Sequence, residues 1–264
     1  MEINLIHAKN TSNKYTIKIP SLGLGVWGIP KNKTEKIVTK AINNGYKHID
    51  TAQIYGNERE VGKAIKDKRG IFITTKVWEN NFGYEKTIKS CEESLSKLNK
   101  IDLLLMHSPH GPEIRKETWE AMQYLLKNRY VKAIGVSNFG IHHIKEILSW
   151  AEIGPCINQI ELSPFLQRRE LVNFCRKNDI ATTAYSPLTH GIRIDDKLSG
   201  FKAEETSFDL TLDNQKLIYA YQPKLKVLSY NLRRPLSIGT HSIELTLRDR
   251  AGNETTKSIK FDVY

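Results

Sequence analysis

Apolar and polar positions alternate between two patterns over most of the chain. Short apolar runs rich in β-branched residues, such as Ile71–Thr75, have the length and composition of buried β-strands. Between these runs, apolar residues such as Ile37, Val38 and Ala41 recur at the period of one helix face. The predicted strands are 22–27, 46–50, 71–76, 101–107, 131–137, 157–161 and 180–186, and the predicted helices are 33–43, 57–68, 84–98, 115–128, 141–150 and 168–177.

This alternation of strand and helix predicts a parallel sheet covered on its outside by helices. No glycine-rich dinucleotide fingerprint follows a predicted strand, which disfavours a Rossmann sheet. A (β/α)8 TIM barrel is favoured, because such barrels collect polar groups at the C-terminal ends of many strands. The predicted fold class is therefore α/β, an incomplete TIM barrel of about seven strands. Residues 15–27 also predict a hairpin, with Tyr15–Ile19 before a Pro-Ser turn and Leu22–Trp27 after it.

The pattern changes after about Lys197. From Phe208 onward, apolar and polar residues alternate one by one in segments separated by turn residues. The alternating apolar positions are Phe208, Leu210 and Leu212, then Ile243, Leu245 and Leu247, and finally Ile259, Phe261 and Val263. This period of two predicts a small antiparallel, β-sandwich-like C-terminal domain. The predicted domains are residues 1–197 and 198–264.

The charge of the chain narrows the classes of function. The 264 residues carry a formal net charge of +11. The basic residues are dispersed rather than gathered into runs with interleaved aromatics, so a solvated surface is favoured over a nucleic-acid interface. A site that attracts an anionic cofactor stays open as a second explanation of the charge.

The apolar runs and the cysteines of the sequence indicate its compartment and redox state. No apolar run approaches the roughly 18 residues of a membrane helix, and residues 1–18 contain no apolar signal core. We therefore expect a cytoplasmic protein with no membrane partner. Cys91, Cys156 and Cys175 form no CxxC pair, so we expect reduced thiols, no disulfide framework and no metal site.

Polar residues stand where the predicted strands end. Asp50 ends the second strand, and Tyr55 follows in the adjoining loop. The later strand ends carry Lys76, His107, Ser137, Asn138, Gln159, Tyr185 and Ser186. Each alone would be an ordinary strand-end or turn residue, but burying an acid, an ammonium and an imidazole at one rim costs free energy unless they pair. The set therefore predicts a convergent site. Asn57 and Glu60 predict a capping box on the following helix.

Seven short motifs carry a family resemblance. They are Leu22–Trp27, His48–Glu58, Thr75–Trp78, Leu105–Pro109, Gly135–Phe139, Asn158–Glu161 and Ala184–Leu188. In this order and spacing they resemble the aldo-keto reductase family from about Tyr15 to Lys197. The resemblance implies an NADP(H)-dependent oxidoreductase that reduces aldehydes or ketones to alcohols, with a small-molecule carbonyl as substrate.

The resemblance also implies a role for each site residue. Tyr55 matches the proton donor, and His107 matches the imidazole that orients the carbonyl. Lys76, paired with Asp50, matches the cation that lowers the pKa of the tyrosine. The residues that match cofactor contacts are Ser137, Asn138, Gln159, Tyr185, Ser186 and Leu188. The residues that match the walls of the substrate pocket are Trp27 and Trp78, beside His107; packing in the core or at the rim is the alternative for both tryptophans.

The chain departs from the family after Lys197, where no eighth strand and no adenosine-side contacts are found. A truncated barrel has open edges, through which it could self-associate. The segment from about Ser199 to Tyr264 resembles bacterial Ig-like modules, through the turn motifs Pro235–His241 and Asp249–Asn253. The alternative function is therefore a catalytically impaired barrel fragment fused to a β-sandwich binding module.

Overall fold

The computed structural model describes residues 2–5, 7, 16–163, 166–187, 192–193, 206–213, 215–216, 220–222, 227–229, 239–249 and 254–263. The chain divides into two compact units. The first comprises Met1–Ile160 and Arg168–Tyr185, and the second comprises Glu161–Gln167 and Ser186–Tyr264. Each unit is described by itself.

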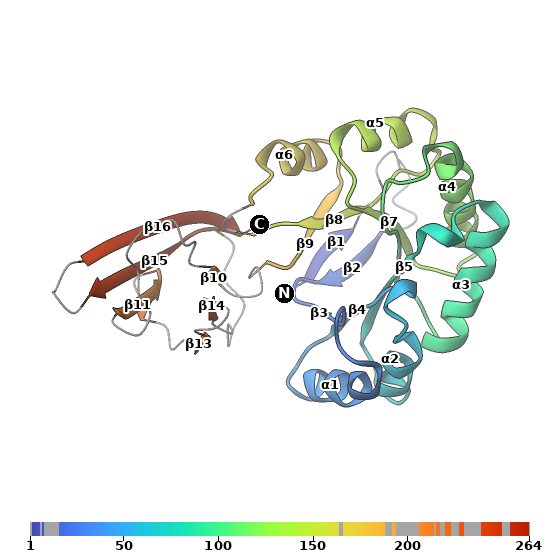
Figure 1. Cartoon of the computed structure of the whole chain (residues 1–264). Helices are drawn as coiled ribbons and strands as arrows, with labels where there is room; N and C mark the ends of the chain where they lie inside the picture. Colours follow the sequence, from blue (N-terminus) through green and yellow to red (C-terminus); the bar gives the residue numbers. More distant parts are fainter. Residues whose placement is uncertain are drawn as a thin grey trace. The chain divides into compact units, whose positions relative to one another are not determined.

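The first unit is built on a parallel sheet whose seven strands lie side by side in chain order (Figure 1). The strands are β3 (Leu24–Gly25), β4 (His48–Asp50), β5 (Phe72–Val77), β6 (Leu103–Met106), β7 (Ala133–Ser137), β8 (Ile157–Glu161) and β9 (Ala181–Tyr185). Every residue of β5, β6 and β7 is buried, as their near-continuous apolar runs predict. The architecture is that of an incomplete TIM barrel, with β3 and β9 at the two ends of the strand order.

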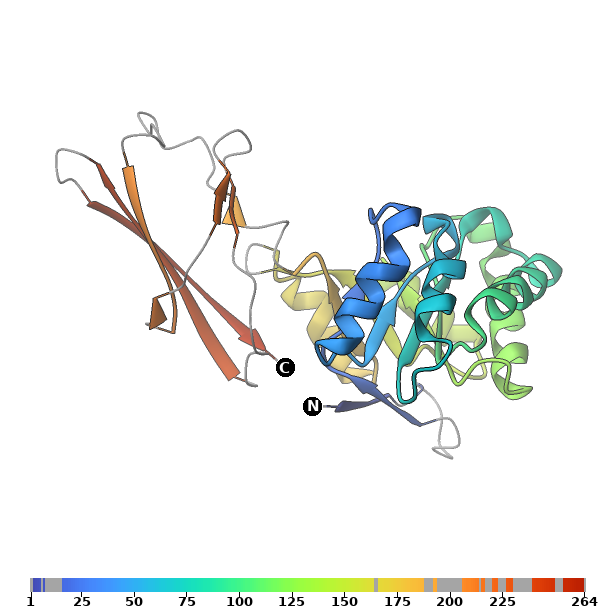
Figure 2. The same cartoon turned by 90° about the horizontal axis from the view of Figure 1, so that it is seen from below.

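The helices of the described first unit cover the outside of this sheet (Figure 1). They are α1 (Lys31–Asn43), α2 (Glu58–Ile65), α3 (Tyr84–Leu98), α4 (Pro112–Lys127), α5 (Ile141–Trp150) and α6 (Arg169–Lys177). α1 packs against α2, α2 against α3, α3 against α4, and α5 against α6, as Figure 2 shows for α1 and α2. The 3-10 turns η1 (Gln53–Tyr55) and η2 (Glu79–Asn81) lie in the loops after β4 and β5. This layout brings the C-terminal end of each strand and the loop that follows it to one rim.

The predicted N-terminal hairpin is wrong. The strand β2 (Ile17–Pro20) pairs antiparallel with β1 (Glu2–Leu5), whereas Leu24 and Gly25 join β4 in parallel register. The buried side chains of Leu5 and Ile19 pack into a core cluster with residues in or just before the barrel strands, namely Phe72, Leu103, Leu105, Ala133, Cys156 and Ile157. The β1–β2 hairpin thus shields apolar side chains that water would otherwise reach. The period of Ile17–Pro20 indicates a strand without identifying its partner.

The predicted capping box at α2 is also wrong. Asn57 occupies the N-cap position, but its side chain makes no capping hydrogen bond. Instead its amide accepts a hydrogen bond from Thr51 Oγ1 at 2.8 Å and donates one to the backbone oxygen of Val26 at 3.1 Å. Asn57 therefore connects the loop after β4 to the loop after β3. Its buried amide needs hydrogen-bond partners, and it finds them in these loops rather than at the helix end.

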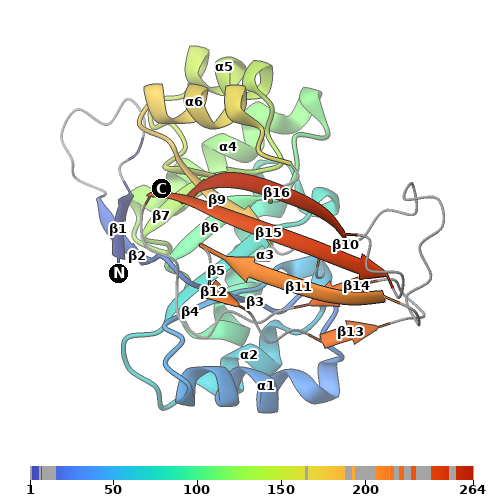
Figure 3. The ribbon, with the colours of Figure 1, turned by 90° about the vertical axis from the view of Figure 1, so that its left-hand side faces the viewer.

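The described strands of the second unit form two antiparallel sheets (Figure 3). One contains β12 (Gln215–Lys216), β11 (Thr206–Leu212), β15 (Gly239–Asp249) and β16 (Glu254–Val263), and the other contains β10 (Ile192–Arg193), β14 (Val227–Ser229) and β13 (Ala220–Gln222). Leu210 stands opposite Leu245, and Ile243 stands opposite Ile259, in agreement with the predicted alternation. The sandwich-like arrangement and the boundary at residue 197 stay predictions, since residue 197, like most of the two turn motifs, lies outside the described residues.

Among the residues that the structure describes, none of the helices combines the length and the apolar character needed to span a lipid bilayer.

Candidate active site

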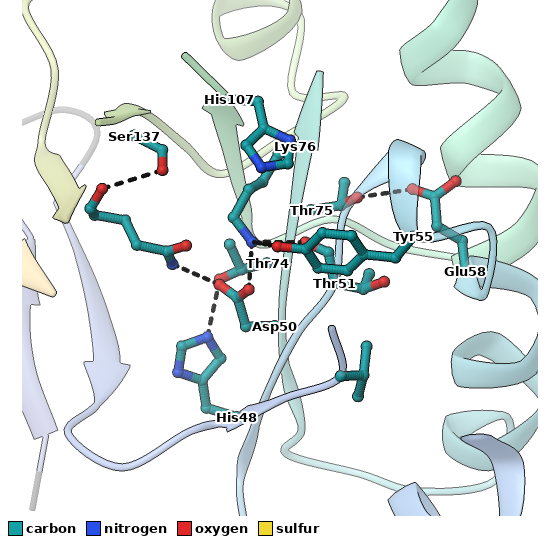
Figure 4. A network of polar contacts seen from close by, with 12 residues as sticks. His48, Asp50, Thr51, Tyr55, Glu58, Thr74, Thr75, Lys76, His107 and Ser137 are labelled. Atoms are coloured by element: carbon teal, nitrogen blue, oxygen red, sulfur yellow. Dashed lines mark hydrogen bonds and ion pairs between the residues drawn. The ribbon is translucent and has the colours of Figure 1, made fainter. Parts of the chain in front are cut away.

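The centre of the site is a buried ion pair between two neighbouring strands. Asp50 ends β4, and Lys76 stands near the end of β5 with 1% of its side chain exposed. The ammonium of Lys76 is hydrogen-bonded to Asp50 Oδ1 and donates a second hydrogen bond to the backbone oxygen of Thr51 at 3.0 Å. A lysine this buried is tolerated because its charge is paired and hydrogen-bonded. Figure 4 shows Lys76 reaching from its strand between Asp50 and Tyr55.

The phenol of Tyr55 completes the coordination of this ammonium. Lys76 Nζ lies 3.4 Å from Tyr55 Oη and 5.1 Å from the centre of its ring. Burial raises the pKa of Tyr55 above its ordinary value, and the charge of Lys76 only partly offsets this. The lowering of the Tyr55 pKa by Lys76, which the resemblance implies, is present but is outweighed by burial. Lys76 favours the phenolate, but desolvation is the larger effect, so Tyr55 is a protonated phenol at neutral pH.

The imidazole of His107 stands between two aromatic rings just after β6. Its ring centre lies 5.9 Å from that of Tyr55 and 5.2 Å from that of Trp78, both in edge-to-face geometry. Burial and the charge of Lys76 lower the pKa of His107 to about 4, so the ring is neutral at pH 7. Its Nδ1 atom is buried, and the described residues offer it no hydrogen-bond partner. A neutral imidazole held in this way can direct a ring nitrogen at a bound ligand.

Amide and hydroxyl groups at the ends of β7, β8 and β9 form the other side of the site. Ser137 Oγ donates to the backbone oxygen of Gln159 at 3.0 Å, and Tyr185 Oη donates to Asn138 Oδ1 at 2.8 Å. The amide of Asn138 donates to the backbone oxygen of His107 at 3.1 Å. Asn138 has φ 65°, a left-handed conformation that asparagine tolerates better than most residues. These neighbouring donors and acceptors fit a ligand that presents a carboxamide, and the ring of Tyr185 offers a face for stacking.

A further hydrogen bond joins the ion pair to the other side of the site. Gln159 Nε2 donates to Asp50 Oδ2 at 2.7 Å, so the carboxylate that holds Lys76 is also held by the end of β8. The structure thus brings together seven of the predicted residues, namely Asp50, Tyr55, Lys76, His107, Ser137, Asn138 and Gln159. Trp78 packs on His107, and Tyr185 is hydrogen-bonded to Asn138.

Three predicted residues remain, of which one, Trp27, belongs to the first unit. Trp27, in the loop after β3, is 67% exposed. Ser186 belongs to the second unit and has φ 48°. Leu188 lies outside the described residues.

Sequence reasoning missed Gln53, whose side chain connects two loops of the site. Gln53 Oε1 accepts hydrogen bonds from the backbone of Trp78 at 2.9 Å and from Asn81 Nδ2 at 2.8 Å. Its amide nitrogen lies 3.2 Å from the backbone oxygen of Ser90 and 3.3 Å from Ser94 Oγ. The only sequence signal was the position of Gln53 between Asp50 and Tyr55 in the 48–58 motif.

Comparisons with known proteins agree with this fold. A family model described as the aldo/keto reductase family matches residues 21–232. The match continues past position 197, where the likeness in the motifs was expected to end. The chain is similar to the 9,11-endoperoxide prostaglandin H2 reductase of Trypanosoma cruzi (45% identical over 183 residues, 67% of this chain and 64% of that protein) and to the glyoxal reductase of Bacillus subtilis (42% over 201 residues, 71% and 72%).

A solved structure leads to the same class. The crystal structure of a Gox0644 mutant in complex with NADPH is 36% identical, with a TM-score of 0.68 over 75% of this chain and 72% of that chain. Fold and comparisons define an oxidoreductase class built on a TIM-type barrel. The chain belongs to the aldo/keto reductase family. The matches span about two thirds of the length of the curated relatives, so the activity of the whole protein is treated below as a proposal.

Proposed function

We propose that the protein reduces aldehydes or ketones to alcohols with NADP(H). The observation that carries this proposal is the position of Lys76 Nζ, which pairs with Asp50 and lies 3.4 Å from Tyr55 Oη. This places a buried cation beside a buried phenol, and a cation there stabilises the phenolate that is left when a proton departs.

In this proposal Tyr55 is the proton donor and His107 orients the carbonyl. Bound NADPH supplies the hydride that reduces the carbonyl carbon. The proton of Tyr55 Oη moves to the carbonyl oxygen, the alcohol is released, and Lys76 stabilises the phenolate until it is reprotonated. His107, neutral at pH 7, donates a hydrogen bond to the same oxygen and so fixes the carbonyl against Tyr55.

The cofactor side of the proposal rests on the strand ends opposite Tyr55. Ser137, Asn138 and Gln159 would hold the carboxamide of the nicotinamide, and Tyr185 would stack on its ring. The resemblance assigns Ser186 and Leu188 to the loop that follows the pyrophosphate. The substrate would lie against His107, Trp78 and Trp27, whose rings supply apolar walls for a small carbonyl compound.

A second candidate is the catalytically impaired barrel fragment. It is favoured by the strand order, in which β3 and β9 end the described parallel sheet, and by the antiparallel strands that follow. In this candidate residues 1–197 are a truncated barrel whose edges mediate self-association, and residues 198–264 are an Ig-like binding module. Such a fragment would lack adenosine-side contacts, each worth about 1.5–3 kcal/mol when charge-assisted.

Titration with NADPH separates the two candidates. The proposed function predicts saturable binding of NADPH, followed by fluorescence, and NADPH-dependent loss of absorbance when a reactive aromatic aldehyde is added. Absence of binding up to millimolar NADPH would contradict it and support the impaired fragment.

A further inference from the structure

The loops that carry Trp78 and His107 are joined by a carboxylate that stands next to both. Glu79 follows Trp78 in η2, and Ser108 follows His107 in the loop after β6. Ser108 Oγ donates a hydrogen bond to Glu79 Oε1 at 2.6 Å. His110 Nδ1, from the same loop as Ser108, lies 2.7 Å from the same carboxylate oxygen.

The hydrogen bond from Ser108 has the features of a strong one. Ser108 is buried, whereas the side chain of Glu79 is 29% exposed, so water competes weakly at the hydroxyl. A length of 2.6 Å is that of a hydroxyl bonded to an ionised carboxylate, and such bonds are roughly twice as strong as neutral ones. The pKa of Glu79 is lowered because hydrogen bonds from Ser108 and His110 outweigh its desolvation, which keeps it ionised at neutral pH.

This bond lies beside the contact between the two rings of the site. The Trp78 and His107 rings are in edge-to-face contact at 5.2 Å, one residue away from Glu79 and Ser108 respectively. The backbone N–H of Trp78 is separately held by Gln53 Oε1 at 2.9 Å. His107 is therefore packed between Tyr55 and a Trp78 whose loop is anchored on both sides.

We propose that Glu79 is a positioning residue, which acts through Ser108 and Trp78 to hold His107 in the orientation that receives the carbonyl. This inference rests on the proposed function. The physical reason is geometric, since a displacement of about 1 Å at an orienting group can cost on the order of 10²-fold in rate.

The charges around His107 are consistent with this role. The charges of Lys76 on β5, Asp50 on β4 and Glu79 in η2 act on the imidazole, and the ring of Tyr55 in η1 contacts it edge-to-face. Burial and Lys76 lower the pKa of His107, whereas Asp50 and Glu79 raise it. Glu79 therefore acts on His107 by charge as well as through its hydrogen bond to Ser108, and variants that alter only one of these separate the two effects.

The test is a series of variants assayed with NADPH and an aromatic aldehyde. Ser108→Ala removes the hydrogen bond without changing any charge, Glu79→Gln keeps an acceptor oxygen but removes the charge, and Glu79→Ala removes both. We expect kcat/KM for the aldehyde to fall about 10-fold to 100-fold in Ser108→Ala and Glu79→Ala and less in Glu79→Gln. The dissociation constant of NADPH should stay within about twofold, because the cofactor contacts come from β7, β8 and β9.

Two controls make this result specific. The double variant Glu79→Ala/Ser108→Ala should be no slower than the slower single variant, because both remove one interaction. Glu113→Gln, which neutralises an exposed carboxylate in the first turn of α4, should leave kcat/KM unchanged. Wild-type kinetics in Ser108→Ala and Glu79→Ala, or additive losses in the double variant, would overturn the role of Glu79 while leaving the proposed function intact.

A second measurement tests the inference without any activity. The ring of Trp78 shifts the NMR signals of the His107 imidazole, so Ser108→Ala should move those signals while the unfolding temperature shows that the variant is folded. Unchanged His107 signals in a folded Ser108→Ala protein would overturn the inference. If wild-type protein reduces no aldehyde, the proposed function fails, and the NMR result still decides whether Glu79 positions His107.

Discussion

Gln159 Nε2 donates a 2.7 Å hydrogen bond to Asp50 Oδ2, although the two residues lie 109 positions apart in the chain. One carboxylate therefore holds both the ammonium of Lys76 and the amide of Gln159. Because Lys76 contacts Tyr55, the proposed cofactor side and the proposed proton donor share a single buried network.

The first consequence concerns Gln159. Gln159→Leu leaves Asp50 Oδ2 without this donor and removes a proposed cofactor contact. We expect the dissociation constant of NADPH to rise about tenfold, which corresponds to the roughly 1–1.5 kcal/mol of one hydrogen bond. Fluorescence titration measures this change. Gln123→Leu, which removes a buried amide bonded to Ile153 away from the site, is the matched control and should leave NADPH binding unaltered.

A second expectation concerns the stability of the ion pair. Lys76→Met leaves Asp50 without its cation, and breaking a buried pair in this way costs about 3–5 kcal/mol. Urea unfolding at pH 7 should show the loss directly. The double variant Asp50→Asn/Lys76→Met should recover part of it, because no unpaired buried charge remains. A single variant as stable as wild type would show that the pair contributes little.

The third expectation is a dependence of stability on pH that comes from His107. Its pKa falls from 6.5 to about 4 on folding, so between these values the unfolded chain binds more protons than the folded one. The contribution of His107 to stability is therefore complete above pH 6.5 and is lost as pH falls toward 4. In His107→Asn, the free energy of unfolding should therefore decrease less than in wild type as pH falls from 6.5 to 4.5. An identical pH slope in both proteins would contradict the lowered pKa.

A fourth expectation tests the packing of α2 against the end of α3. A Cβ atom added at Gly62 would lie 1.8 Å from the backbone oxygen of Lys97. Gly62→Ala should therefore destabilise the protein, by roughly 1–3 kcal/mol as overpacked cores do. Gly25→Ala is the control, because a Cβ at Gly25 meets no atom within 4 Å. Thermal unfolding of the two variants gives the comparison, and equal unfolding temperatures would refute the close approach.

Much of the barrel follows from local pattern. The predicted helices Tyr84–Leu98 and Ile141–Trp150 have the observed bounds, as does the strand Ile157–Glu161, because each has one clear period bounded by turn or capping residues. The hairpin of Glu2–Leu5 with Ile17–Pro20 was missed, since the period of a strand does not encode its partner.

The candidate site likewise contains residues that the sequence predicts and residues that it does not. The residues Asp50, Lys76 and His107 stand at or beside strand ends, which the apolar runs locate in the sequence. Gln53, Glu79 and Ser108 act between loops, and their contacts depend on which loops become neighbours in space. The direction in which the pKa of Tyr55 shifts could not be predicted from the sequence either, because it depends on how far burial outweighs the charge of Lys76.

The most direct test of the account is the rate of NADPH-dependent aldehyde reduction by Tyr55→Phe, measured beside wild type at pH 7. Tyr55→Phe removes the proton and preserves the ring that packs on His107. We expect kcat/KM to fall by about 10²-fold to 10⁴-fold, the range for a general acid, while the protein stays folded and NADPH binding is unchanged. Reduction at the wild-type rate by a folded Tyr55→Phe protein would contradict the assignment of Tyr55 as the proton donor.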